Sequence, residues 1–124
     1  MDSLVYEGAI YGVPWFTDAG MLYYRTDLLE EAGFSEPPGT WDEMKEMALK
    51  TAQDTGTRDG FVFQGAEYEG GTVNGLEYIW THGGDVLSGD QVVIDSPEAV
   101  AGLETERSMI SDGVASQAVS TYKE

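Results

Sequence analysis

The sequence has 124 residues, and 23 acidic residues against 6 basic ones give it a formal net charge of -17 at pH 7. This length supports one domain with one core, and the hydrophobic share of 41% lies well above that of a disordered chain. The charge argues against nucleic acids and anionic membranes as partners, because affinity for phosphate depends on clusters of Lys and Arg, and the absence of Cys excludes disulfides and thiolate metal sites.

The first stretch predicts two short strands or a hairpin over residues 4–13, leading to Pro14. The chain then breaks and places Trp15 and Asp18 together in a short irregular segment. An aromatic face beside a carboxylate suits a sugar, because the ring offers an apolar surface and the carboxylate accepts hydrogen bonds from hydroxyls. The alternative is a strand break in which Trp15 belongs to the core and Asp18 caps a turn.

Residues 20–24 form a continuous apolar run, which is typical of a strand covered on both faces. A short helix follows, with Thr26 or Asp27 as its N-cap and Gly33 as its C-terminal stop. After a proline-rich break, a second helix opens with a capping box and should end near residues 53–56. The capping-box residues are Thr40 and Glu43, and one face of this helix holds Trp41, Met44, Met47 and Ala48.

Residues 60–64 predict a buried strand, and residues 65–71 predict a polar, glycine-rich loop at its carboxyl end. Residues 72–80 carry apolar side chains at helical spacing, and two glycines at 83 and 84 end that helix. A hairpin is expected over residues 85–95, where two apolar runs flank a Gly-Asp pair.

A last helix opens at Ser96, with proline at its first position, and ends at Gly113. One side of it holds Val100, Leu103 and Ile110. Residues 114–124 show no clear preference. The alternation of β and α elements predicts an α/β fold with a mixed sheet flanked by helices.

Few residues suit catalysis or a metal site, and no cofactor is expected. His82 is the only histidine and stands just before two glycines, which indicates a helix end rather than a triad or a metal ligand. Residues 54–60 predict a polar turn rather than a calcium loop, because the alternating acids and the distal Glu are missing. Glu67 and Glu69 could flank a sugar near Asp18, as two carboxylates do in a glycosidase, and this alternative stays open.

Binding fits the polar and aromatic side chains better. Sugar pockets combine amphipathic rings with a few polar groups, and ligands of open α/β sheets gather at the carboxyl ends of strands, where residues 65–71 fall. The alternatives are an exposed loop for Tyr68 and Glu69, core packing for Trp41 and Trp80, and a structural or interaction domain without a ligand. The candidate sugar-binding residues are Trp15, Asp18, Gln64, Tyr68, Glu69 and Asn74, with Trp80 as a further ring.

Five spaced motifs resemble, in their order, the family 1 extracellular solute-binding proteins of ABC importers, with a nearest likeness to the trehalose/maltose-binding branch. They cover nearly the whole chain: IYGVPWFTDAGMLYYRTDLLEEAGF (residues 10–34), PPGTWDEM (37–44), GFVFQGAEYEG (60–70), LEYIWTHGGDVL (76–87) and VVIDSPEAVAGLE (92–104). Carried over by position, Asp18 matches a sugar-hydroxyl acceptor with Trp15 beside it, and Tyr68 and Glu69 match a loop on the pocket side of the second lobe.

The resemblance implies a periplasmic-binding-protein type II fold, in which two hinged lobes close on a saccharide and present it to a membrane permease. Residues 1–124 would then be a single partial domain: a hinge crossing over about 10–18, followed by the first half of the carboxyl-side lobe. The implied function is capture of a disaccharide or short oligosaccharide, without catalysis. The implied location is extracellular, cell-surface anchored or periplasmic, with signal and anchor outside these residues.

Some residues depart from the family pattern. Gly71 and Gly75 stand where relatives usually have bulkier residues, and Thr105 and Glu106 stand where an apolar pair is common. These differences affect the expected identity of the ligand more than the assignment to the family. Because closure requires two lobes, the isolated chain is expected to bind sugar weakly and to self-associate through exposed apolar surface.

The acidic residues are dispersed along the chain rather than gathered in one tail, which indicates a solvated acidic shell on a folded body. We expect adaptation to high salt, where screening shortens like-charge repulsion to about 3 Å at 1 M.

Overall fold

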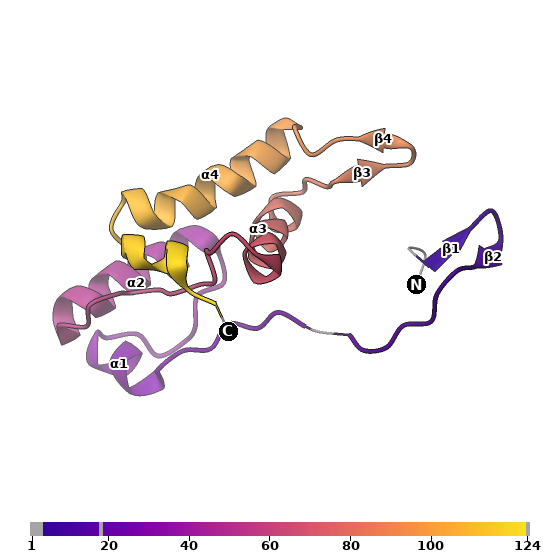
Figure 1. The fold of residues 1–124 in the computed structure, drawn as a ribbon. Helices are drawn as coiled ribbons and strands as arrows, with labels where there is room; N and C mark the ends of the chain where they lie inside the picture. Colours follow the sequence, from indigo (N-terminus) through magenta and orange to yellow (C-terminus); the bar gives the residue numbers. More distant parts are fainter. Residues whose placement is uncertain (1–3, 18, 124) are drawn as a thin grey trace.

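The computed structural model describes residues 4–17 and 19–123. Over these residues four α-helices and a short 3-10 helix form a body, from which two small hairpins and an extended N-terminal segment project (Figure 1). No helix in these two ranges has both the length and the apolar character needed to cross a membrane. In chain order the elements are β1 (Val5–Tyr6), β2 (Ala9–Ile10), α1 (Thr26–Glu31), α2 (Trp41–Thr55), α3 (Glu69–Thr81), β3 (Leu87–Ser88), β4 (Gln91–Val92), α4 (Pro97–Ser111) and η2 (Gln117–Thr121).

Both predicted hairpins are confirmed. β1 pairs antiparallel with β2, and the two turn residues between them, Glu7 and Gly8, both have positive φ, as in a type I′ turn. β3 pairs antiparallel with β4 across Gly89 and Asp90, where Gly89 takes the positive φ of 60°. These two pairs are all the sheet that the described residues form.

The strands predicted over residues 20–24 and 60–64 are wrong, because both stretches are extended but belong to no sheet. A strand needs a neighbour that satisfies its N–H and C=O groups. No backbone hydrogen bond joins residues 20–24 to another described segment, and Tyr23 is 85% exposed. Residues 60–64 lie against the core through Phe61 and Phe63 instead of pairing with a strand.

The helix ends largely follow the predicted capping chemistry. Thr40 Oγ1 accepts the Glu43 N–H at 3.1 Å, which confirms the N-terminal cap of α2, and Gly56 ends that helix with a φ of 70°. Ser96 Oγ accepts the Ala99 N–H at 3.2 Å at the start of α4. The starts of α2 and α4 are therefore set by local chemistry that is readable in the sequence. In contrast, α3 starts at Glu69, inside the predicted loop over residues 65–71, and no side chain caps it.

The start of α1 differs from the prediction. Arg25, rather than Thr26 or Asp27, is its N-cap residue, and no side chain caps it. The Asp27 carboxylate accepts from the Arg25 guanidinium at 2.7 and 2.5 Å. The predicted C-terminal stop at Gly33 is confirmed by its φ of 89°.

The pair formed by α3 and α4 is the main tertiary contact of the body. The buried residues of α4 are Ala99, Gly102 and Met109, whereas Val100 and Leu103 stay 44% and 41% exposed. A Cβ atom at Gly102 would lie only 2.5 Å from the Tyr78 carbonyl oxygen. The two helices therefore contact each other closely at Gly102, where no side chain separates their backbones. The larger side chains of Val100 and Leu103 lie outside this contact and stay partly exposed.

The core lies between α2, α3, α4 and the C-terminal residues. Residues 114–123, which the sequence leaves unassigned, supply Val114 and Val119, both fully buried, and form η2. The remaining core members are Met44, Ala48, Tyr78, Met109 and Ala115. This core fixes the place from which residues 64–68 cross to the start of α3.

Candidate functional site

Residues 64–68 connect the core to α3 and carry two of the predicted site residues. On one side the Gly65 N–H donates to the Val119 carbonyl at 3.1 Å. On the other side Tyr68 is the N-cap residue of α3, and its carbonyl accepts the Thr72 N–H at 3.2 Å. Both ends of the segment are therefore held by backbone hydrogen bonds.

The side chains of Gln64 and Tyr68 converge above Gly70, in the first turn of α3. A Cβ atom placed on Gly70 would lie 2.2 Å from Gln64 Oε1 and 2.3 Å from the Tyr68 hydroxyl oxygen. The two oxygens therefore lie close together, and glycine is the residue that leaves room for both. Lys123 Nζ also lies 5.4 Å from the centre of the Tyr68 ring. This arrangement offers an amide oxygen, a hydroxyl and a ring edge in one place, which suits a polyhydroxylated ligand.

Asn74 and Glu69, both predicted as sugar ligands, lie on α3 near this place. Asn74 is partly buried, and its Oδ1 accepts the Gln64 N–H at 3.1 Å. Glu69 is the first residue of α3 and is exposed. The structure thus brings Gln64, Tyr68 and Asn74 together, with Glu69 beside them.

The other half of the predicted site is not joined to this group. Trp15 is 90% exposed on the extended segment that leads away from the helical body (Figure 1), so the alternative of Trp15 as a core residue is wrong. Asp18 lies outside the described residues.

For the other two tryptophans, Trp41 and Trp80, core packing was the alternative to a place in the site. Trp41 packs against the core. Trp80 does not, because it is 52% exposed, with its indole N–H directed at Asp85 Oδ1 at 3.4 Å.

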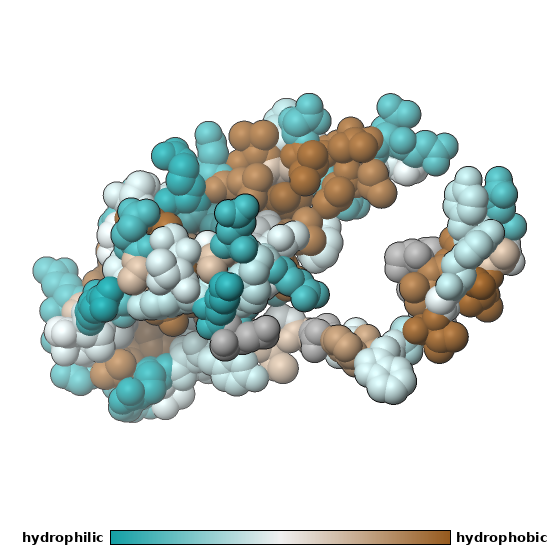
Figure 2. Space-filling view, in the orientation of Figure 1, coloured by the Kyte–Doolittle hydropathy of each residue, from teal (hydrophilic) through white to brown (hydrophobic). Residues whose placement is uncertain are grey.

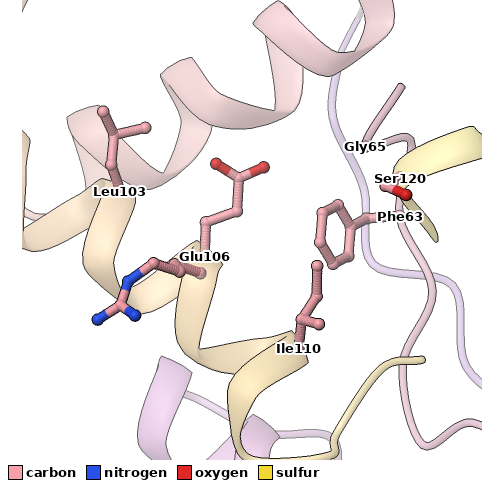
Figure 3. Close-up of a pocket in the computed structure, with 7 residues that line it drawn as sticks. Phe63, Gly65, Leu103, Glu106, Ile110 and Ser120 are labelled. Carbon is pink, nitrogen blue, oxygen red and sulfur yellow. The ribbon is translucent and has the colours of Figure 1, made fainter. Parts of the chain in front are cut away.

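A groove of about 370 Å³ runs from Tyr68 along α3 to α4. Its apolar wall includes Leu76, Ile79, Ile94 and Leu103, and its polar residues are Glu67, Tyr68, Thr72 and Glu106. A smaller hollow of about 180 Å³ adjoins it and shares Gly65, Leu103 and Glu106 with it. Figure 3 shows the Glu106 carboxylate in this hollow, between Leu103 and the Phe63 ring.

Glu106 and Thr72 are polar residues of this groove that were not among the predicted site residues, and Glu106 is the charged one. Burial among apolar neighbours raises the pKa of its carboxyl above the ordinary value, so the group holds its proton more readily than a surface Glu. The signal in the sequence was a carboxylate at helical spacing between Leu103 and Ile110, both expected on one side of α4.

His82 has the structural role that its position predicts. It is the C-cap residue of α3, and its Nδ1 donates to the Tyr78 carbonyl at 2.8 Å. Its Nε2 lies 3.0 Å from the Thr105 hydroxyl on α4. The imidazole therefore links the two helices.

The two carboxylates of the glycosidase alternative, Glu67 and Glu69, are both exposed. Among residues 4–17 and 19–123, no group of three or more His, Cys, Asp or Glu side chains could hold a metal ion.

Comparison with known proteins places the chain among binding proteins. A family model described as bacterial extracellular solute-binding protein matches residues 2–123. The probable ABC transporter-binding protein of Deinococcus radiodurans is 42% identical over 125 residues, which cover 94% of this chain and 29% of that protein.

Two solved structures are similar over nearly the whole chain. Maltose-bound MalE3 of T. maritima aligns with a TM-score of 0.86 and 52% identity over 99% of this chain and 32% of that chain. An ABC transporter solute binding protein from Thermotoga lettingae, bound with alpha-D-tagatose, aligns with a TM-score of 0.76 and 28% identity over 98% of this chain and 32% of that chain. The chain thus spans about a third of the length of the proteins that it matches.

Proposed function

Since the chain belongs to the bacterial extracellular solute-binding protein family, we propose that it serves as part of the sugar-binding component of an ABC importer. Its membership confirms the resemblance found in the motifs. The similarity to MalE3 likewise confirms the predicted fold class at the level of part of one lobe of a periplasmic-binding-protein type II fold. The predicted mixed sheet is not formed, because the described residues pair only in two antiparallel hairpins. The proposed ligand is a disaccharide or short oligosaccharide, and the proposed role is binding without catalysis.

The convergence of Gln64 and Tyr68 above Gly70 is the observation that supports this function most directly. A tyrosine ring can lie against the apolar face of a sugar, while its hydroxyl and the glutamine amide exchange hydrogen bonds with the sugar hydroxyls. Proteins similar to this chain over most of its length were solved with maltose and with alpha-D-tagatose, so saccharides are the natural class to test.

We propose that residues 1–124 supply a hinge crossing over about 10–18 and the first half of the carboxyl-side lobe. The chain covers about a third of each relative, which fits a part of one lobe. Trp15 and Asp18 would then face the ligand from the crossing, and Gln64, Tyr68 and Glu69 would face it from the lobe. The proposed partners are the saccharide and a membrane permease, and the proposed location is outside the cytoplasmic membrane or in the periplasm.

Isothermal titration tests the function, using maltose, trehalose and glycerol phosphate with the full-length polypeptide that carries these residues. We expect binding of a saccharide and a fall of about two- to twelvefold in affinity for Tyr68→Ala, since a ring contact contributes about 0.5–1.5 kcal/mol. Leu49→Ala is the control, because Leu49 is exposed on α2 and is not one of the groove residues.

Two results would contradict the proposal. One is equal affinity of wild type and Tyr68→Ala for every saccharide that binds. The other is turnover of aryl glycosides or oligosaccharides that is lost in Glu67→Gln or Glu69→Gln, which would favour the glycosidase alternative.

A further inference from the structure

The Asn74 side chain faces back from α3 onto the backbone of residues 64–68. The Gln64 N–H donates to it at 3.1 Å, and because a backbone N–H can only donate, the accepting atom is the amide oxygen. Gly65 and Tyr68 N–H groups in the same segment donate to backbone carbonyls, of Val119 and Ala66. The Gln64 N–H is the one of these three that a side chain holds.

The segment also lies directly on the first turn of α3, without a side chain between them. A Cβ atom at Gly71 would come within 2.3 Å of the Ala66 carbonyl oxygen. Contact between two backbones leaves little room to adjust, so the distance from residues 64–68 to α3 is set by Gly71 on one side and by the Asn74 hydrogen bond on the other.

We propose that Asn74 is a positioning residue, which holds residues 64–68 against α3 so that Gln64 and Tyr68 meet the saccharide, and that it does not itself bind the saccharide. This inference rests on the proposed function of the site. It revises the sequence-based prediction that made Asn74 a sugar ligand. Release of the Gln64 N–H would let the segment shift, and a shift of about 1 Å in a recognition group is enough to weaken binding severely.

Two variants separate the positioning role from a ligand role. Asn74→Asp keeps an oxygen that can accept the Gln64 N–H but removes the amide N–H₂ that a sugar-binding Asn would donate. Asn74→Leu removes the acceptor and keeps a side chain of similar size, and Asn74→Ala is the smaller alternative if the leucine variant does not fold. Gly71→Ala displaces the segment by an independent route.

Hydrogen exchange of the Gln64 amide, followed by NMR in the 124-residue chain, reads the positioning contact without any ligand. We expect exchange roughly tenfold faster in Asn74→Leu and an unchanged rate in Asn74→Asp. Titration with maltose and trehalose in the full-length polypeptide should show a loss of tenfold or more for Asn74→Leu and for Gly71→Ala, and a change of less than about threefold for Asn74→Asp.

An unchanged Gln64 exchange rate in Asn74→Leu would overturn the inference. So would an affinity loss in Asn74→Asp equal to that in Asn74→Leu while the Gln64 amide stays protected, because the missing N–H₂ would then be the ligand contact. If wild type binds none of the saccharides, the proposed function fails, and the exchange measurement still decides whether Asn74 holds the segment.

Discussion

Trp41 of α2 stacks on Tyr78 of α3, with ring centroids 4.2 Å apart and planes inclined by 23°. The Trp41 indole N–H donates to the Thr81 hydroxyl at 2.8 Å, one turn further along α3. Tyr78 is 2% exposed and packs against the same core as Met109 of α4. The stacked pair therefore joins three helices through one side chain, Tyr78.

Tyr78→Phe should stabilise the chain. Among the described residues the Tyr78 hydroxyl is buried without a hydrogen-bond partner, and a buried unsatisfied polar group costs free energy. We expect the free energy of unfolding to rise by up to about 1 kcal/mol in Tyr78→Phe, and to fall by about 3–5 kcal/mol in Tyr78→Ala, which loses the stacking as well. Urea denaturation measures both, and a loss of stability in Tyr78→Phe would show that the hydroxyl has a partner.

Two glycines at the contact of α3 and α4 should respond to alanine in opposite ways. A Cβ atom at Gly75 meets only ordinary contacts of 3.5 and 3.7 Å, so Gly75→Ala should stabilise α3 by up to about 1 kcal/mol. A Cβ atom at Gly102 would lie within 2.9 Å of three backbone atoms of α3, so Gly102→Ala should destabilise by about 1–3 kcal/mol. Thermal unfolding of both variants at one salt concentration tests the contact, and equal effects would contradict it.

Glu106→Gln should stabilise the chain near neutral pH but not in acid. The pKa of the Glu106 carboxyl is raised by burial, so its favourable contribution is complete below the ordinary Glu pKa and is lost as the pH rises through the raised one. The variant should gain a few degrees in Tm at pH 7, and its melting curve should approach that of wild type near pH 4.

Asp112→Asn is the control of opposite sign for that experiment. Hydrogen bonds from Lys45 and Ser111 lower the pKa of the Asp112 carboxyl, so its contribution is present above the ordinary Asp pKa and is lost as the pH falls through the lowered one. This variant should be the less stable protein at pH 7 and should converge on wild type in acid. Identical pH profiles for the two variants would contradict both assignments.

Stability should rise with salt, because the chain has 23 acidic residues against 6 basic ones. Repulsion among the excess acidic side chains opposes the folded state, and salt screens that repulsion. Four ion pairs are recorded among the described residues, all of them with at least one exposed partner, and such pairs contribute little. Melting the chain from dilute buffer to molar sodium chloride should give a steady increase in Tm. Equal Tm values at both ends of the series would show that the acidic side chains do not make the stability of the chain depend on salt.

The 124-residue chain should self-associate as its concentration rises. Hydrophobic residues gather where the β3–β4 hairpin meets the N-terminal end of α4 (Figure 2), and Leu87, Val92 and Val100 are 55%, 68% and 44% exposed there. Light scattering at high salt should show an apparent mass that grows with concentration and falls in Val92→Glu. Leu49→Glu on α2 is the control, and a monomer at every concentration in wild type would remove this prediction.

Helices and hairpins were predictable here because their signals are local. The Thr40 and Ser96 caps and the turn glycines act within a few residues of their own position, so the sequence around them suffices. Residues 20–24 were not predictable, since an apolar run becomes a strand only if another segment pairs with it. The buried side of α4 was missed because Gly102 carries no hydropathy signal, although it is where the two helices meet.

The proximity of some candidate site residues was more predictable than their individual contacts. Tyr68 and Gln64 come together as polar and aromatic side chains around a glycine-rich loop should. The contact of Asn74 depends on which atom of its amide faces Gln64. Whether the Glu106 side chain enters the groove depends on how α4 is rotated against α3. Neither quantity is encoded in spacing along the chain.

The backbone contact at Gly102 has a consequence for how a ligand would be received. Helices that touch through main-chain atoms cannot slide past each other without a clash. Under the proposed function, α3, α4 and residues 64–68 would therefore move as one rigid unit when two lobes close on a ligand. A saccharide that binds at Tyr68 would then contact a surface that is already ordered in the folded chain, so little further conformational entropy would be lost on binding.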